Sequence, residues 1–101
     1  MEVITISGVL LSKNEVRTDA RGVKFLTFSV GTEEKDMVGN VYRNTYRCYC
    51  YNMSNPDVLE MKQGDMLVLS GTFRILRRGN NYNFDVYVKQ ISPLNIKHND
   101  K

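Results

Sequence analysis

Residues 71–89 read GTFRILRRGNNYNFDVYVK, a pattern that predicts one long β-hairpin. Gly79-Asn80-Asn81 at its centre is a turn signal, because Gly and Asn tolerate the positive φ that tight hairpin turns need. The runs on either side are rich in β-branched and aromatic residues, which suit a pleated sheet. By alternation, one face carries Phe73, Ile75 and Arg77 before the turn, and one face carries Tyr82, Phe84, Val86 and Val88 after it.

The end of this predicted hairpin is basic and aromatic. Arg77, Arg78 and Tyr82 lie next to the turn, and no acidic residue follows Thr72 before Asp85. Such an end offers positive charge to a phosphate backbone and a ring to an unstacked base. The alternative is a pair of solvated arginines beside a turn, so the rest of the chain has to decide between the two.

The composition is that of one small globular domain. With 101 residues, of which 42% are hydrophobic and 25% charged, the chain is long enough for a thin but real core. Its formal net charge of +3 is compatible with a nucleic-acid partner. The charges are segregated, since Arg43 and Arg47 lie in a stretch without acids, whereas acids gather at 33–36 and 57–65.

The two cysteines, Cys48 and Cys50, are two residues apart and would share one face of a strand. A zinc site needs about four ligands, and His98 is the only histidine in the chain. We therefore interpret both cysteines as small buried apolar side chains. Without a disulfide framework, the expected compartment is the reducing cytoplasm.

Several function classes are disfavoured. The N-terminus lacks the basic and apolar regions of a signal peptide, and no apolar run is long enough to span a membrane. The sequence holds no Ser/His/Asp set, no paired-carboxylate spacing and no phosphate-binding glycine loop. We therefore expect neither an enzyme nor a cofactor or metal.

The pattern as a whole predicts five strands and one helix. Gly8 interrupts the first strand, and a glycine there often marks a bulge or a close crossing of two backbones. Pro56 after Ser54 or Asn55 as cap is typical of a helix start. The predicted strands are 2–11, 23–31, 41–52, 65–78 and 82–92, with a helix at 54–63 and a polar loop at 12–22. Residues 32–40 are charged and end in Gly39-Asn40, a second hairpin signal. This order predicts an all-β, five-stranded Greek-key barrel, the OB-fold, over residues 1–93, with a short polar tail at 94–101.

The predicted strand at 41–52 holds four tyrosines and two arginines. One face carries Tyr42, Asn44, Tyr46, Cys48 and Cys50, and the other carries Arg43, Thr45, Arg47, Tyr49 and Tyr51. The cysteines indicate that the first face turns inward toward its end, but alternation leaves open which tyrosines emerge. Interleaved arginine and tyrosine are typical of a single-strand binder. The alternative is that the rings only fill the core and the sheet.

OB-folds bind oligonucleotides or oligosaccharides on the face of their second and third strands, between two loops. In the predicted second strand, small polar Thr27 and Ser29 alternate with apolar residues, and flat bases can lie on such a face. The residues expected to bind nucleic acid are Arg43, Tyr46, Arg47, Tyr49, Arg74, Arg77, Arg78 and Tyr82.

Seven short motifs follow one another along the chain in a recognisable order. They are Ile4-Thr-Ile-Ser-Gly8-Val-Leu10, Glu15-Val-Arg17, Phe28-Ser-Val30, Thr45-Tyr46-Arg47, Lys62-Gln-Gly64-Asp65, Leu69-Ser-Gly71-Thr-Phe-Arg74 and Tyr82-Asn-Phe-Asp-Val-Tyr-Val88. In their order and spacing, these motifs resemble the bacterial single-stranded DNA-binding protein family over roughly residues 3–92. The family usually has Thr-Glu-Trp where this chain has Thr45-Tyr46-Arg47.

The resemblance implies an OB-fold that binds single strands. It places Tyr46 at a base-stacking tryptophan of the family, and Arg74, Arg77, Arg78 and Tyr82 in the region that grips the DNA backbone. The chain has no tryptophan, and it ends Lys97-His-Asn-Asp-Lys101 where the family has a linker and an acidic tail. In this respect it is similar to the short primosomal replication protein and to phage- or mobile-element-encoded binding proteins. The resemblance also implies a homodimer or homotetramer.

Two functions follow from these observations. The first is sequence-nonspecific binding of single-stranded DNA in replication, recombination or repair, by rings that stack on bases and arginines that neutralise phosphates. The alternative is a primosome-type adaptor that docks a replication protein, with DNA binding secondary. Stacking and phosphate contacts do not read the 2′-hydroxyl, so the sequence leaves the choice between DNA and RNA open.

Overall fold

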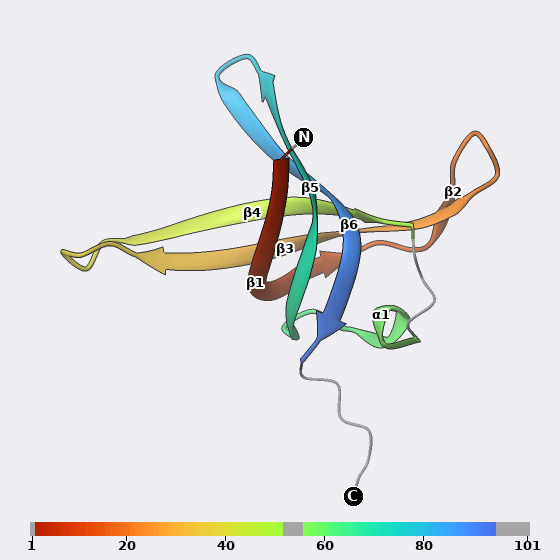
Figure 1. Cartoon of the computed structure of the whole chain (residues 1–101), viewed down its shortest axis with the longest axis horizontal. Coiled ribbons are helices and arrows are strands. Elements are labelled where there is room, and N and C mark those ends of the chain that lie inside the picture. Colours follow the sequence, from red (N-terminus) through yellow and green to blue (C-terminus); the bar gives the residue numbers. More distant parts are fainter. Residues whose placement is uncertain (1, 52–55, 95–101) are drawn as a thin grey trace, which may run out of the picture.

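The structure is a computed structural model that describes residues 2–51 and 56–94, without the side chains of Glu2 and Arg78. Figure 1 shows six strands and one short helix. They are β1 (Glu2–Lys13), β2 (Arg17–Thr18), β3 (Lys24–Lys35), β4 (Val41–Cys50), α1 (Pro56–Glu60), β5 (Met66–Arg78) and β6 (Asn81–Pro93). Within these described residues, no helix has the length and apolar character to cross a membrane.

The five long strands close into a barrel. The sheet runs β1-β5-β6-β4-β3-β2, and a further pairing of β1 with β3 closes it. All neighbours are antiparallel except β4 and β6, which run parallel. This closed five-stranded barrel with one short helix confirms the predicted OB-fold.

The barrel closes because β1 bends from one neighbour to the other. Its first part pairs with β5 and its last part with β3, with a register shift between Leu10 and Ser12. At the crossing, a Cβ on Gly8 would collide with the carbonyl oxygen of Gly31. The predicted close backbone crossing at Gly8 is therefore confirmed.

The core lies inside the barrel. It is built mainly from apolar side chains at alternate positions of the strands, with two more from α1 and the segment that follows it. Its buried members are Ile6, Leu10, Leu26, Phe28, Val30, Cys48, Cys50, Val58, Met61, Leu67, Leu69 and Val86. Both cysteines are buried, as predicted, and no disulfide links them. Burial raises the pKa of the Cys48 thiol to about 12, because a thiolate would lose its water inside the barrel.

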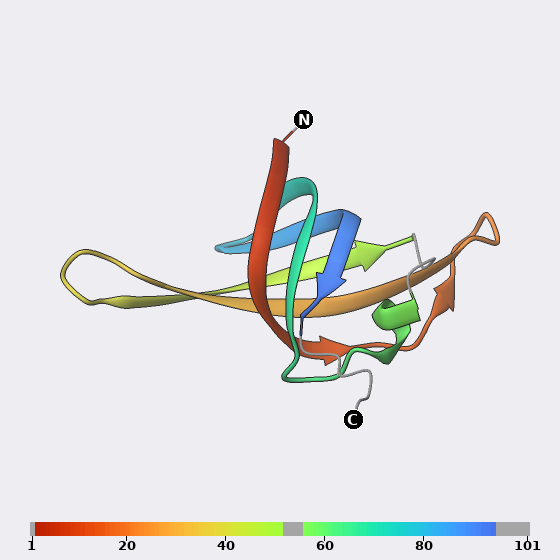
Figure 2. The same cartoon turned by 60° about the horizontal axis from the view of Figure 1, so that its bottom comes forward.

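The helix lies at one end of the barrel (Figure 2). Val58 of α1 and Met61, which follows it, are fully buried against the core. The helix is shorter than the predicted range of 54–63, and the proposed caps Ser54 and Asn55 lie outside the described residues.

Two hairpins extend beyond the barrel as arms (Figure 1). One is formed by β5 and β6, as predicted, and the other by β3 and β4. The hairpin signal at Gly39-Asn40 is confirmed by this second hairpin, but the predicted strand 23–31 ends too early, because β3 continues to Lys35. Cross-strand pairs such as Glu33 with Arg43 extend the ladder there, and Asp36 closes the loop by accepting backbone N–H bonds from Val38 and Asn40. The predicted loop over 12–22 also contains a short strand, β2, which pairs with the start of β3.

Candidate nucleic-acid interface

The outer face of β3, β4, β6 and β5 is built from rows of side chains that lie opposite one another. One row runs Ser29, Arg47, Asp85 and Arg74, from β3 to β5. The next row runs Thr27, Tyr49, Tyr87 and Thr72. The opposite side of these strands carries the core residues. The outer face is thus a single surface with rings and charges at its centre and small polar residues on its flanks.

Two tyrosines stack at the centre of this face. The ring centroids of Tyr49 and Tyr87 are 5.1 Å apart, with an angle of 19° between the planes. Tyr87 is 36% exposed. Thr27 and Thr72, the neighbours in the row, are small and leave room around the rings. Tyr49 is half-buried, so the pair presents a partly exposed aromatic surface on which an unpaired base can stack.

Arg47 lies beside this pair, and its guanidinium group is bound to the carboxylate of Asp85. Its guanidinium carbon is 5.7 Å from the centroid of the Tyr49 ring, within the range of a cation–π interaction. Its Nε lies 3.2 Å from Asp85 Oδ1 and its Nη2 3.3 Å from Oδ2. The hydrogen bonds that Arg47 donates to Asp85 are the main cause that raises the pKa of Arg47. We refer to Tyr49, Tyr87, Arg47 and Asp85 as the tyrosine platform.

A hollow links the tyrosine platform to the β5–β6 hairpin. It has a volume of about 220 Å³ and is lined by Thr45, Arg47, Tyr82, Asn83 and Phe84. Tyr82 is 58% exposed, so its ring is available at the edge of this hollow. The structure therefore brings Tyr82 next to Arg47, from which it is far apart in the sequence.

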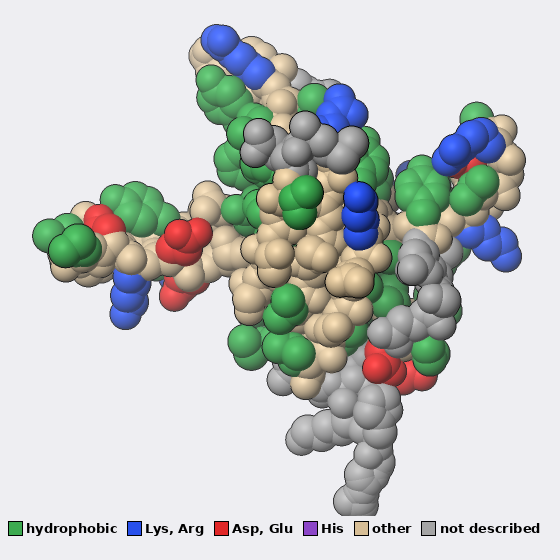
Figure 3. Space-filling model, in the orientation of Figure 1, with side chains coloured by type: hydrophobic (Ala, Val, Ile, Leu, Met, Phe, Trp, Pro, Cys, Tyr) green, Lys and Arg blue, Asp and Glu red, His purple; other side chains and the backbone are tan. Residues whose placement is uncertain are grey.

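The arginines of the hairpin differ in their surroundings. Arg74 is exposed and lies in the same row as Asp85. Arg77 is also exposed, and its Nε donates a hydrogen bond of 3.0 Å to the carbonyl oxygen of Gly79. The side chain of Arg78 lies outside the described part of the structure. Figure 3 shows Lys and Arg side chains at the end of this hairpin and Asp and Glu on the β3–β4 arm.

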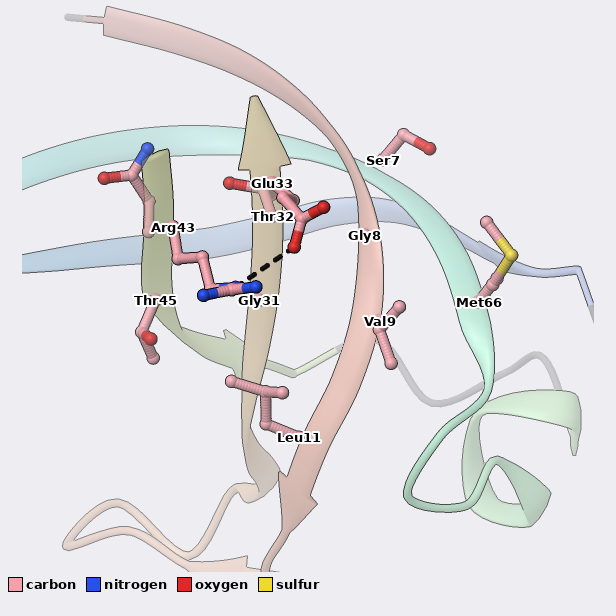
Figure 4. Close-up of a pocket in the computed structure, with 11 residues that line it drawn as sticks. Ser7, Gly8, Val9, Leu11, Gly31, Thr32, Glu33, Arg43, Thr45 and Met66 are labelled. Atoms are coloured by element: carbon pink, nitrogen blue, oxygen red, sulfur yellow. Dashed lines mark hydrogen bonds and ion pairs between the residues drawn. The ribbon is translucent and has the colours of Figure 1, made fainter. Parts of the chain in front are cut away.

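Arg43 lies apart from the other predicted residues. Its Nε is 3.0 Å from Glu33 Oε2, across the β3–β4 arm. The pair lines a pocket of about 390 Å³ whose walls include Val9, Leu11 and Met66 (Figure 4). The positive charge of an arginine that already pairs with a carboxylate is partly neutralised. Arg43 is therefore a weaker candidate for a phosphate contact.

Tyr46 lies on the inner side of β4, opposite Arg47 and Tyr49. Its ring packs against the core, with centroids 6.1 Å from Phe73 and 5.7 Å from Phe84. The side chain is only partly exposed. This position favours a packing role over the base-stacking role that the resemblance assigns to Tyr46.

Two members of the tyrosine platform were not among the predicted site residues. Asp85 and Tyr87 come from β6, which lies next to β4 only because these two strands pair in parallel. Alternation along 83–89 puts both on one face of the strand, but it does not show which strand lies beside them. The sequence signal for this part of the site was an acid and a tyrosine two residues apart, Asp85 and Tyr87.

The described residues contain no group of three or more His, Cys, Asp or Glu that could hold a metal ion. The side chains of the outer face offer stacking, hydrogen bonding and positive charge.

A scan against protein-family models finds no match, and a search of curated proteins finds no relative. Solved structures do match. A small single-stranded DNA-binding protein from Streptomyces coelicolor has a TM-score of 0.74 at 14% identity, over 93% of this chain and 93% of that one. PriB from Ralstonia solanacearum has a TM-score of 0.70 at 9% identity, over 93% of this chain and 99% of that one.

A third match is a complex with DNA. The Plasmodium falciparum single-stranded DNA-binding protein with bound single-stranded DNA has a TM-score of 0.66 at 16% identity, over 94% of this chain and 96% of that one. At these identities the likeness shows the fold. This chain has the OB-fold that these single-stranded DNA-binding proteins and PriB also have.

Proposed function

We propose that this protein binds single-stranded DNA without sequence preference and serves DNA replication, recombination or repair. The observation that carries the proposal is the tyrosine platform, a stacked and partly exposed aromatic pair beside a fixed arginine on the outer face of an OB barrel. Stacking tolerates any base, because every base has a π-face. The two buried cysteines, which no disulfide links, suit a reducing compartment, so we place this function in the cytoplasm.

We expect stacking to supply a larger share of the affinity than the arginines of β4. Arg43 and Arg47 each pair with a carboxylate of the same chain. Stacking contributes about 1–3 kcal/mol of binding free energy per base. Each phosphate contact on a single strand steepens the plot of log K against log salt, the salt slope, by about 0.7. We propose that Arg74 and Arg77 supply the phosphate contacts and that the salt slope is correspondingly small.

The test compares labelled oligo-dT, oligo-U and a matched DNA duplex at low and moderate salt. We expect tight binding of the single strand, weak binding of the duplex and a modest loss with salt. The oligo-U arm measures the preference between DNA and RNA. No binding of any single strand would contradict the proposal.

We also propose that the chain forms a homodimer or homotetramer. Over Glu2–Gly8, β1 pairs with β5 on one side, and none of the described strands pairs with its other edge. An unpaired edge is a template for a strand of a second copy. Val3, which is 72% exposed on this stretch, adds an apolar contact. Light scattering that gives a monomer mass at micromolar concentration would contradict this assembly.

A second candidate function is that of a primosome-type adaptor. It rests on the fold likeness to PriB and on Met37 and Val38, two exposed apolar side chains at the end of the β3–β4 arm. Such residues can dock a replication protein. The same oligonucleotide titration discriminates the two candidates, because an adaptor with secondary DNA binding would bind oligo-dT weakly even at low salt.

A further inference from the structure

We propose that Phe25, Tyr51, Arg21 and Asp19 form a second base-stacking site, which we call the loop platform. The inference rests on the proposed function and names a further position on the same single strand of DNA. Its ligand is one unpaired base, at the opposite end of β4 from the Arg43–Glu33 pair.

The loop platform has an aromatic pair of its own. The ring centroids of Phe25 and Tyr51 are 5.1 Å apart, with an angle of 21° between the planes. Leu26 pairs with Cys50 in the β3–β4 register, which brings the residues just beyond them opposite each other. Tyr51 is 39% exposed, so its ring is available to a ligand.

An arginine is fixed beside these rings by a carboxylate. The guanidinium carbon of Arg21 is 5.9 Å from the centroid of the Tyr51 ring. Its Nε and Nη2 donate to Asp19 Oδ2 at 3.1 and 2.8 Å. Asp19 Oδ1 in turn accepts the backbone N–H groups of Arg21 and Val23 at 2.9 and 3.0 Å. The turn is therefore built around Asp19, which holds the guanidinium in place.

The two platforms have the same construction. Each has two rings whose centroids are 5.1 Å apart, a guanidinium within 6 Å of the ring contributed by the 49–51 stretch, and a carboxylate that binds this guanidinium. Only the source of the carboxylate differs, since Asp85 comes from β6 and Asp19 from the turn before β3. A surface ring that merely fills space needs no such arrangement, and its repetition points to a shared ligand.

The spacing of the platforms suits one continuous strand. Tyr49 and Tyr51 lie on the same side of the chain, two residues apart, which is about 7 Å in an extended strand. Beyond Tyr51, Arg17 of β2 lies opposite Phe25, and Lys24 is next to it. Both basic residues are exposed and can meet the phosphates that follow a base on the loop platform. The segment that contains β2 and the turn before β3 also extends from the barrel (Figure 1). Figure 3 shows basic side chains on it, as it does at the end of the β5–β6 hairpin.

The test measures binding of thymidine mononucleotide and of oligo-dT up to about 16 nucleotides long to the wild type and to Tyr51→Ala. We expect Tyr51→Ala to lose about 5- to 150-fold in affinity for long oligonucleotides, the value of one stacked base. Because the platforms lie about 7 Å apart, a mononucleotide occupies only one of them at a time, and its affinity should differ by no more than about two-fold between the two proteins. If Tyr51 has only a structural role, Tyr51→Ala should leave the affinities for short and long ligands unchanged or should lower both by the same factor.

Two further variants keep the test decisive. Tyr51→Leu retains apolar bulk without the ring and replaces Tyr51→Ala if the latter lowers the melting temperature. Tyr42→Ala removes an exposed tyrosine from the β3–β4 arm and should leave affinity unchanged. If the wild type binds long oligo-dT and the Tyr51 variants bind it equally well, the loop platform is refuted while the proposed function stands. If the wild type binds no single strand, both are refuted.

Discussion

Asp85 binds Arg47 from beneath the outer face of the barrel, across the parallel strands β4 and β6. The Asp85 side chain is 3% exposed and the Arg47 side chain 46%. A buried carboxylate is costly unless a charge pairs with it, so this contact fixes the guanidinium next to the Tyr49 ring. Arg47 thus completes a stacking surface, and much of its charge is neutralised before any ligand arrives.

This relationship predicts the effect of Asp85→Asn on salt dependence. The variant removes the charge that neutralises Arg47, which then becomes free to pair with a phosphate. We expect the slope of log K against log salt to become steeper by about 0.7, with tighter binding at low salt. Glu34→Gln makes the same change of charge on the exposed β3–β4 arm and should leave the slope unchanged. Equal slopes for wild type and Asp85→Asn would show that Arg47 already contacts phosphate.

Tyr87 offers the most direct test of the tyrosine platform. Its ring stacks on Tyr49 and is partly exposed, so its removal takes away stacking surface without opening the core. Tyr87→Ala should weaken binding of oligo-dT by about 1–3 kcal/mol, measured by fluorescence anisotropy. Tyr87→Phe keeps the ring and should bind like the wild type. If Tyr87→Ala keeps full affinity and an unchanged melting temperature, bases do not stack at this site.

Patterns within one strand or hairpin were predictable from the sequence, and contacts between distant strands were not. The turn at Gly79 and the crossing at Gly8 follow from local rules on φ and on backbone contact. The pairing of Arg47 with Asp85 depends on a parallel neighbour 38 residues away, which no local pattern specifies. The position of Tyr46 shows a second limit, because a shift of one residue moves a side chain to the other face of a strand. An approximate motif match cannot resolve that shift between Tyr46 and Arg47.

The placement of Tyr46 predicts a stability effect for Tyr46→Ala. Its ring packs between Phe73 and Phe84 at the edge of the core, so truncation leaves a partly open cavity. Full burial would give about 3–5 kcal/mol, and for this partly exposed ring we expect about 2 kcal/mol of lost unfolding free energy in urea. Affinity of the folded variant for oligo-dT should stay close to that of the wild type. Unchanged stability with a large loss of affinity would restore the stacking role that the resemblance gives to Tyr46.

The buried Cys48 predicts slow thiol chemistry in the folded protein. Its pKa is raised from 9.0 to about 12, so the thiol stays protonated below pH 9 in both the folded and unfolded states. Above pH 9 only the unfolded state loses the proton, and stability should therefore fall as pH rises from 9 toward 12. At pH 8, iodoacetamide should label the protein only in denaturant. Rapid labelling under native conditions would mean that the barrel opens near β4.

Variants of Arg74 and Arg43 give a matched comparison of how the salt dependence of binding arises. Both are exposed arginines on the outer face, but Arg43 is bound to Glu33 and lies on the far arm, whereas Arg74 lies in the row of Asp85. If Arg74 contacts one phosphate, Arg74→Gln should reduce the magnitude of the salt slope by about 0.7. Arg43→Gln should change it little, because Glu33 already competes for that charge. The opposite ranking would move the path of the DNA backbone from the β5–β6 hairpin to the β3–β4 arm.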